Sequence, residues 1–125
     1  MSLHDLYIFA DQQDIEIQYI PCGETAIALP TGKIGIDPDH ENAVVLAHEI
    51  GHIMTYGFYS FSTDEETIRK HEAEATRFAI ELLIPREEFY DFVRGEYITP
   101  WVLADYFGIS EEFAEKVIKY YKSLL

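Results

Sequence analysis

The first third of the chain shows two kinds of hydrophobic pattern. Apolar residues recur at helical spacing over residues 2–13, which predicts a short first helix. Hydrophobic and polar residues then alternate over 14–20, as in a strand with one buried face. Two more short strands are expected at 25–29 and 33–36, each preceded by a turn that contains proline and glycine. Three short strands in succession predict an antiparallel meander with a helix on one face.

The rest of the chain has a helical pattern. A helix is expected over 37–56, because an Asp-Pro-Asp segment provides an acidic cap and a proline in the first turn. A long helix over 65–83 follows, and Pro85 ends it. Shorter helices are expected at 87–94, 99–107 and 110–123. Together these elements predict an α+β fold, with a small three-stranded antiparallel sheet packed on a mostly helical domain that spans residues 1–125.

The charge balance restricts the possible partners. The 125 residues include 9 Lys and Arg against 23 Asp and Glu, so the formal net charge is −14. Affinity for nucleic acid depends mainly on basic side chains that displace counterions from phosphates. We therefore expect no direct binding to nucleic acid, whereas a basic protein would be attracted electrostatically.

Cysteine content and apolar runs bear on the cellular compartment. Cys22 is the single cysteine, so an internal disulfide is excluded and a reducing environment fits best. No apolar run approaches the roughly 20 residues that a membrane-spanning helix needs. The first residues also lack the basic start and apolar stretch of a secretory signal. A cytoplasmic protein without membrane association is expected.

The strongest chemical signal is the segment His48-Glu49-Ile50-Gly51-His52, an H-E-x-x-H motif within a predicted helix. Residues four apart lie about 40° from each other on a helix, so both imidazoles project from one face and can reach one zinc ion. Glu49 lies about 100° away, which suits it to hydrogen-bond a water on the metal rather than to bind the ion itself. Two structural histidines are the alternative, which the buried character of this helix makes the weaker interpretation.

A catalytic zinc needs a third protein ligand, and the candidates lie on the next helix. The core face of that helix is marked by Ala75, Phe78, Ala79, Leu82 and Leu83. His71 and Glu72 lie about 50° from the centre of this face, and Glu74 roughly twice as far. A carboxylate on a second buried helix is a common partner for this motif, which ranks Glu72 ahead of His71, with Glu74 third. For each glutamate the alternative is a solvated helix face.

Two segments resemble a known family. Residues 46–52, Leu-Ala-His-Glu-Ile-Gly-His, are similar to the zinc helix of the ImmA/IrrE metallopeptidases. Residues 72–85 are similar to a second motif of that family, Glu-x-Glu/Gln-Ala-Asn-x-Phe-Ala followed by Leu-Leu-Met/Ile-Pro. Thr76 departs from this pattern, since the family usually has Asn there. The resemblance covers roughly residues 14–125, and two motifs in the right order are far more specific than H-E-x-x-H alone.

The resemblance implies a zincin-like domain of the gluzincin type. His48, His52 and Glu72 would then bind Zn2+, and Glu49 would be the catalytic residue. The implied function is zinc-dependent endopeptidase activity on an intracellular protein, typically a helix-turn-helix transcriptional repressor encoded beside the peptidase. Such genes often belong to prophages, mobile elements or stress responses.

Two other functions compete with this one. The first is a non-catalytic zinc-stabilised module that sequesters a repressor or acts in a toxin–antitoxin pair. The second is DNA binding, since residues 103–110 resemble the first helix and turn of a helix-turn-helix. The following segment, 111–116, is rich in acids and has no Arg, Gln or Asn, which is the opposite of what base edges and phosphates require. Two helices that pack on the core are therefore expected there.

One further segment could contribute to a site. Four aromatic residues lie within 56–61, directly after the zinc-motif helix. They could line a substrate groove, but aromatic residues more often close a core, and that is the expectation here. A tyrosine or His40 could stabilise the charge that develops on a scissile carbonyl, and the sequence does not select one.

Overall fold

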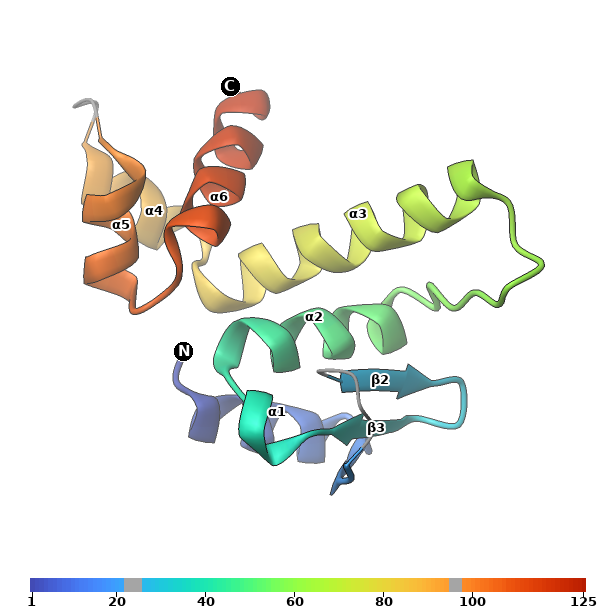
Figure 1. The fold of residues 1–125 in the computed structure, drawn as a ribbon. Helices are drawn as coiled ribbons and strands as arrows, with labels where there is room; N and C mark the ends of the chain where they lie inside the picture. The colour runs from blue at the N-terminus through green and yellow to red at the C-terminus, as the bar shows by residue number, and fades with distance from the viewer. Residues whose placement is uncertain (22–25, 95–97) are drawn as a thin grey trace. The chain divides into compact units, whose positions relative to one another are not determined.

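The computed structural model describes residues 1–21, 26–94 and 98–125, which form two compact units, Met1–Leu83 and Ile84–Leu125. The first unit contains α1 (Leu3–Gln12), β1 (Glu16–Tyr19), β2 (Ala26–Leu29), β3 (Lys33–Ile36), the 3-10 turn η1 (Pro38–His40), α2 (Ala43–Met54) and α3 (Glu65–Leu83). The second contains α4 (Arg86–Val93), α5 (Pro100–Phe107) and α6 (Glu111–Ser123). Figure 1 shows this order along the chain. The α+β class is confirmed, while the expectation of a single domain over residues 1–125 stays a prediction.

The prediction for the start of the second helix was wrong. Asp37 does cap a helical turn, since its side chain accepts a hydrogen bond from Asp39 N, but that turn is the short η1. The chain is extended again at Glu41 and Asn42, and the Asn42 side chain then caps α2 by accepting from Val45 N at 2.9 Å. A second cap therefore divides the predicted helix in two.

The sheet is mixed, which corrects the antiparallel meander expected from the sequence. Its strand order is β1-β3-β2, with β2 and β3 antiparallel and β1 parallel to β3. The β2–β3 hairpin closes as expected, with Gly32 at φ 85 and its N–H bonded to Leu29 O. β3 takes the centre because Ile34, Gly35 and Ile36 are all buried, and a strand buried on both faces belongs between two others. The turn expected at 21–24 lies almost wholly outside the described residues.

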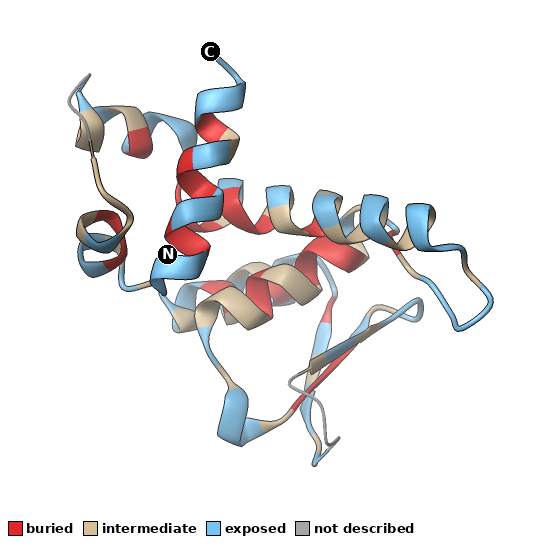
Figure 2. Cartoon of the chain, turned by 45° about the horizontal axis from the view of Figure 1, so that its top comes forward, coloured by how far each residue is buried: buried red, intermediate tan, exposed pale blue. Residues whose placement is uncertain are grey.

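Helix α2 lies between the sheet and α3 (Figure 1). It contacts β2 and β3 on one side and α3 on the other, which is why it is apolar around most of its circumference. The buried hydrophobic residues of this unit gather mainly on the facing sides of these elements (Figure 2). They are Leu6, Ala10, Ile15, Ile34, Ile36, Leu46, Ala47, Ile50, Ala75, Ala79, Ile80 and Leu83.

The contact between α2 and α3 is unusually close at Gly51. A Cβ atom at this position would lie 2.6 Å from the carbonyl oxygen of Ala75 and 3.0 Å from its Cα. Such distances leave no room for any side chain, and the atoms in the way are backbone atoms, which cannot turn aside. Glycine at position 51 therefore sets how near the two helices approach.

The second unit has its own core around α6, with Ile84, Phe89, Leu103, Ala104, Phe113, Ala114, Val117, Ile118 and Tyr121 buried. Gly108 in the left-handed conformation ends α5, and Ser110 caps α6. The Tyr121 hydroxyl donates a hydrogen bond to the Ile84 carbonyl within this core. Both α5 and α6 contribute buried residues to this core and contact each other, so the expectation of two helices that pack on the core is confirmed. Along the described parts of the chain, no helix combines the length and apolarity that crossing a bilayer requires.

The Gly51→Ala substitution tests the helix contact. At an ordinary helical position it would stabilise the protein by about 1 kcal/mol, because alanine has the higher helix propensity. Here the new methyl group collides with the Ala75 backbone, so we expect the free energy of unfolding to fall by about 1–3 kcal/mol. Urea unfolding of the metal-free protein gives this value, and a gain in stability would show that the helices do not need the close approach.

Candidate metal centre

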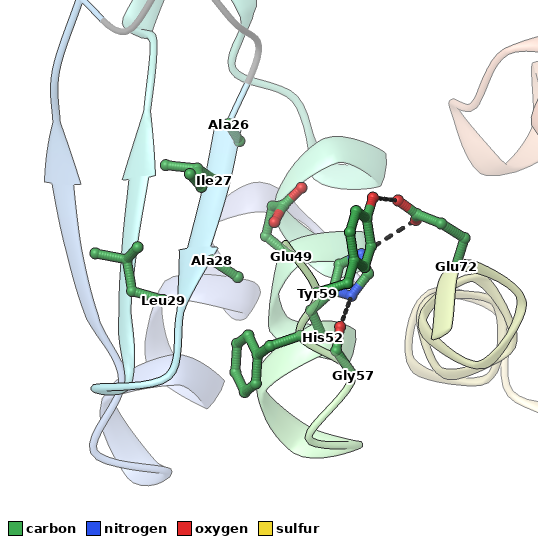
Figure 3. Close-up of a pocket in the computed structure, with 10 residues that line it drawn as sticks. Ala26, Ile27, Ala28, Leu29, Glu49, His52, Gly57, Tyr59 and Glu72 are labelled. Atoms are coloured by element: carbon green, nitrogen blue, oxygen red, sulfur yellow. Dashed lines mark hydrogen bonds and ion pairs between the residues drawn. The ribbon is translucent and has the colours of Figure 1, made fainter. Parts of the chain in front are cut away.

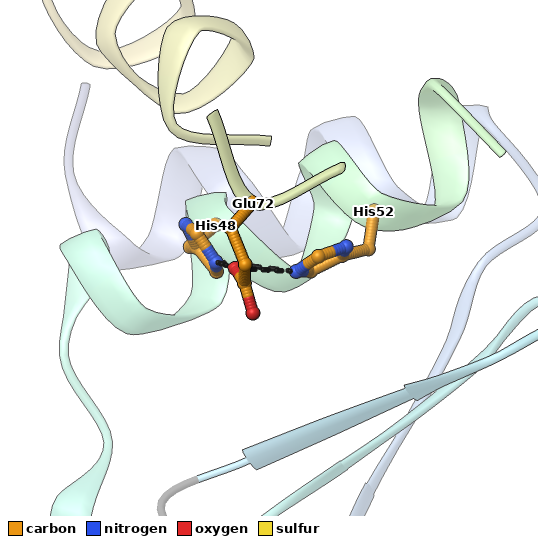
Figure 4. Close-up of side chains that lie close together, drawn as sticks. All are labelled: His48, His52 and Glu72. Atoms are coloured by element: carbon orange, nitrogen blue, oxygen red, sulfur yellow. Dashed lines mark hydrogen bonds and ion pairs between the residues drawn. The ribbon is translucent and has the colours of Figure 1, made fainter. Parts of the chain in front are cut away.

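Three side chains from two helices converge in the first unit (Figure 4). His48 and His52 lie one turn apart on α2, and Glu72 lies on the facing side of α3. Glu72 Oε2 is 2.7 Å from His48 Nε2 and 3.1 Å from His52 Nε2, and the two imidazole nitrogens are 3.2 Å apart. The helical spacing of the motif and the close approach of α3 together produce this triangle.

Nδ1 of His52, the ring nitrogen that faces away from the triangle, is held by the turn that ends α2. Gly57 N bonds to His52 O and Tyr56 N to Ile53 O, with Tyr56 in the left-handed conformation at φ 54, so the chain reverses directly after the helix. This reversal places the Gly57 carbonyl 2.7 Å from His52 Nδ1, which donates to it. In a neutral ring whose proton lies on Nδ1, Nε2 is the nitrogen that can bind a metal ion.

His48 has a weaker outer contact. Its Nδ1 lies 3.4 Å from the hydroxyl oxygen of Thr76, one helical turn beyond Glu72 on α3. This is the position at which the sequence departs from the family pattern. Threonine retains a polar group there that can accept the Nδ1 proton, at a distance near the limit of a hydrogen bond.

Glu72 uses its two oxygens differently. Oε2 faces the imidazoles, whereas Oε1 accepts a hydrogen bond from the Tyr59 hydroxyl (Figure 3). Partial burial alone raises the pKa of this carboxyl group, but the Tyr59 hydroxyl and the two histidines favour the charged form more strongly. The net result is a pKa below the ordinary value for glutamate, so Glu72 is a carboxylate at neutral pH.

The donor set fits a zinc ion. A tetrahedral zinc with bonds of about 2.0–2.1 Å holds its donor atoms about 3.3–3.4 Å apart. The three donor atoms here are 2.7–3.2 Å apart, so a shift of a few tenths of an ångström would accommodate the ion. Two imidazoles and one carboxylate are also the protein ligands of one class of catalytic zinc site. His48, His52 and Glu72 can therefore hold a metal.

A cavity of about 400 Å3 opens beside these residues. Strand β2 forms one side, the segment 57–59 after α2 forms another, and His52 and Glu72 lie at its edge (Figure 3). Glu49 also lines it, with its side chain on the side of α2 that faces β2. The cavity is therefore bordered both by two members of the triangle, His52 and Glu72, and by the Glu49 carboxylate.

The other predicted candidates lie outside the triangle. His71 precedes Glu72 on α3, and its buried Nδ1 has no hydrogen-bond partner among the described residues. Glu74 is partly buried but is not part of the group that could hold a metal. His40 is exposed, and its Nδ1 lies 3.6 Å from a carboxylate oxygen of Asp37.

The aromatic segment after α2 does not close the core, contrary to expectation. Tyr56 is 81% exposed and Phe61 is fully exposed, while Phe58 and Tyr59 line the cavity. The sequence analysis did not identify Gly57 and Tyr59 as site residues. A glycine directly after a zinc-motif helix was the available signal, because it indicates that the chain turns back towards the helix end.

Comparisons with known proteins agree with this geometry. The family model described as the IrrE N-terminal-like domain, named Peptidase_M78, matches residues 10–119. Neither the curated proteins nor the solved structures gave a significant match. The matched range includes both motifs and the three residues of the triangle. The chain therefore belongs to the Peptidase_M78 family of IrrE N-terminal-like domains, a family of the metallopeptidase type, as its resemblance to ImmA/IrrE proteins had indicated.

Proposed function

We propose that this protein is a zinc-dependent endopeptidase in which His48, His52 and Glu72 bind the metal and Glu49 is the general acid and base. One observation carries the proposal: the donor atoms of the three proposed ligands converge at the edge of a cavity that Glu49 also lines. Metal site, carboxylate and space for a peptide thus occur together, as hydrolysis requires.

Zinc is proposed because imidazole and carboxylate donors in a compact set of three suit it. When bound, it would supply Lewis acidity to a water molecule and to the scissile carbonyl. The Gly57 carbonyl and the Thr76 hydroxyl keep the outer nitrogens of the two imidazoles occupied, so that both Nε2 atoms stay directed at the ion.

Glu49 moves the proton in this proposal. It is adjacent to His48 in sequence but lies on the side of α2 that faces β2 and the cavity. Its carboxylate would accept a proton as water attacks the peptide carbonyl and would then deliver that proton to the leaving amine.

The proposed substrate is a helix-turn-helix transcriptional repressor in the cytoplasm, as the resemblance to ImmA/IrrE proteins implies. DNA-binding proteins carry basic surfaces, and a chain with a net charge of −14 attracts them electrostatically. The same charge disfavours direct binding to nucleic acid, and α6 begins with the exposed acids Glu111 and Glu112. From the same resemblance, we propose that the protein functions in a prophage, a mobile element or a stress response.

The ligand set is tested by metal affinity. We expect one zinc ion per chain. We expect Glu72→Ala to weaken zinc affinity by more than about 100-fold, because loss of a ligand should exceed the 10–100-fold effect of losing a residue that hydrogen-bonds to a ligand. Glu74→Ala is the matched control, since it removes a nearby carboxylate of the same helix and should leave the affinity unchanged. Competition with a chromogenic chelator measures both. Loss of zinc in the Glu74 variant alone would assign the third ligand to that residue instead.

The role of Glu49 is tested by Glu49→Gln. This variant should bind zinc like the wild type and hydrolyse its substrate about 100- to 10,000-fold more slowly, because the amide cannot accept a proton. The substrate for the assay is the helix-turn-helix protein encoded by the adjacent gene, with fragments identified by mass spectrometry. Full activity of the variant would remove Glu49 from the mechanism. An intact, stable complex with the wild-type protein and no fragments would show sequestration rather than proteolysis.

A further inference from the structure

We propose that Tyr59 is a positioning residue, whose hydroxyl holds one oxygen of Glu72 so that only the other oxygen binds the metal. This inference rests on the proposed metal site and adds a residue that is neither a ligand nor a group acting on the substrate. The Tyr59 hydroxyl donates to Glu72 Oε1, while Oε2 lies against the two imidazoles.

Glu72 needs such a partner because its surroundings leave it room to move. Its side chain is 39% exposed and projects from α3 across the gap to α2. A glutamate with three rotatable bonds can present one or both oxygens to a metal, and nothing in α3 itself selects between them. The hydrogen bond from Tyr59 engages the oxygen that a two-oxygen contact would need, and so favours binding through Oε2 alone.

The backbone of the segment 57–59 explains how Tyr59 reaches this position. The turn at Tyr56 sends the chain back along the end of α2, where the Gly57 carbonyl accepts from His52 Nδ1. Two residues later, the Tyr59 ring lies edge-on to the His52 ring, with centroids 6.2 Å apart, and its hydroxyl meets Glu72. One short segment therefore orients a proposed ligand on each helix.

The exposure of Tyr59 supports the same conclusion. The residue is 43% exposed and is not one of the buried core residues. The ring contacts His52 and the hydroxyl contacts Glu72, so its described partners include two of the three proposed ligands. Because the hydroxyl alone reaches the carboxylate, Tyr59→Phe removes the positioning contact and keeps the ring.

The experiment compares wild type, Tyr59→Phe and Tyr56→Phe, loaded with Co2+ or Zn2+ alone. Tyr56 is the control because it lies on the same turn, is 81% exposed and is remote from the proposed role. In Tyr59→Phe we expect zinc affinity to fall about 10-fold, the lower end of the range for outer contacts to a ligand. We also expect its Co2+ visible absorption to weaken, because a carboxylate bound through both oxygens raises the coordination number. Tyr56→Phe should match the wild type in both measurements.

The outcomes separate this inference from the proposed function. If the wild type binds zinc and Tyr59→Phe has the same affinity and the same Co2+ spectrum, the positioning role is wrong while the metal site stands. The role is also wrong if metal binding is unchanged and only kcat falls, since the hydroxyl would then act on the substrate. If the wild type binds neither metal, the metal site itself fails and this inference with it.

Discussion

The candidate site depends on one packing contact, the close approach of α2 to α3 at Gly51 and Ala75. Gly51 directly precedes His52, and Ala75 lies three residues after Glu72, so the contact is at the centre of the metal-binding group. The axes of two packed helices usually lie about 8–10 Å apart, and the distance depends on the size of the side chains at the contact. A glycine at the crossing brings the helices near enough for a single glutamate to bridge to both histidines. The geometry of the triangle is thus a consequence of packing as much as of the H-E-x-x-H spacing.

Helical periodicity explains why most of this site could be predicted from the sequence. The positions of His48 and His52 follow from the pitch of one helix. Glu72 and His71 lie equally near the apolar face of the next helix, and Glu72 was ranked first because a carboxylate is a common partner of the motif. Both arguments need only residues that are close in sequence. They succeed because regular helices carry side chains at fixed angles, whatever the rest of the chain does.

The features that were mispredicted or missed depend on contacts between distant residues. The parallel pairing of β1 with β3 does not follow from alternation within either strand, which specifies a buried face but no neighbour. The cap at Asn42 competes with an equally plausible one at Asp37, and the structure uses both. The contact of Tyr59 with Glu72 depends on the path of the chain after α2, and this path is set by a left-handed residue that is not a glycine. Gly57 indicated a turn after the helix, but no local pattern identifies Tyr59 as the residue that reaches Glu72.

The segment 57–59 has a mechanical consequence. It forms one wall of the cavity and also contacts His52 and Glu72, which line the same cavity. A molecule in the cavity would therefore contact the same segment whose Gly57 and Tyr59 hold these two side chains. Binding in the cavity and the orientation of the proposed metal ligands His52 and Glu72 therefore depend on the same three-residue segment.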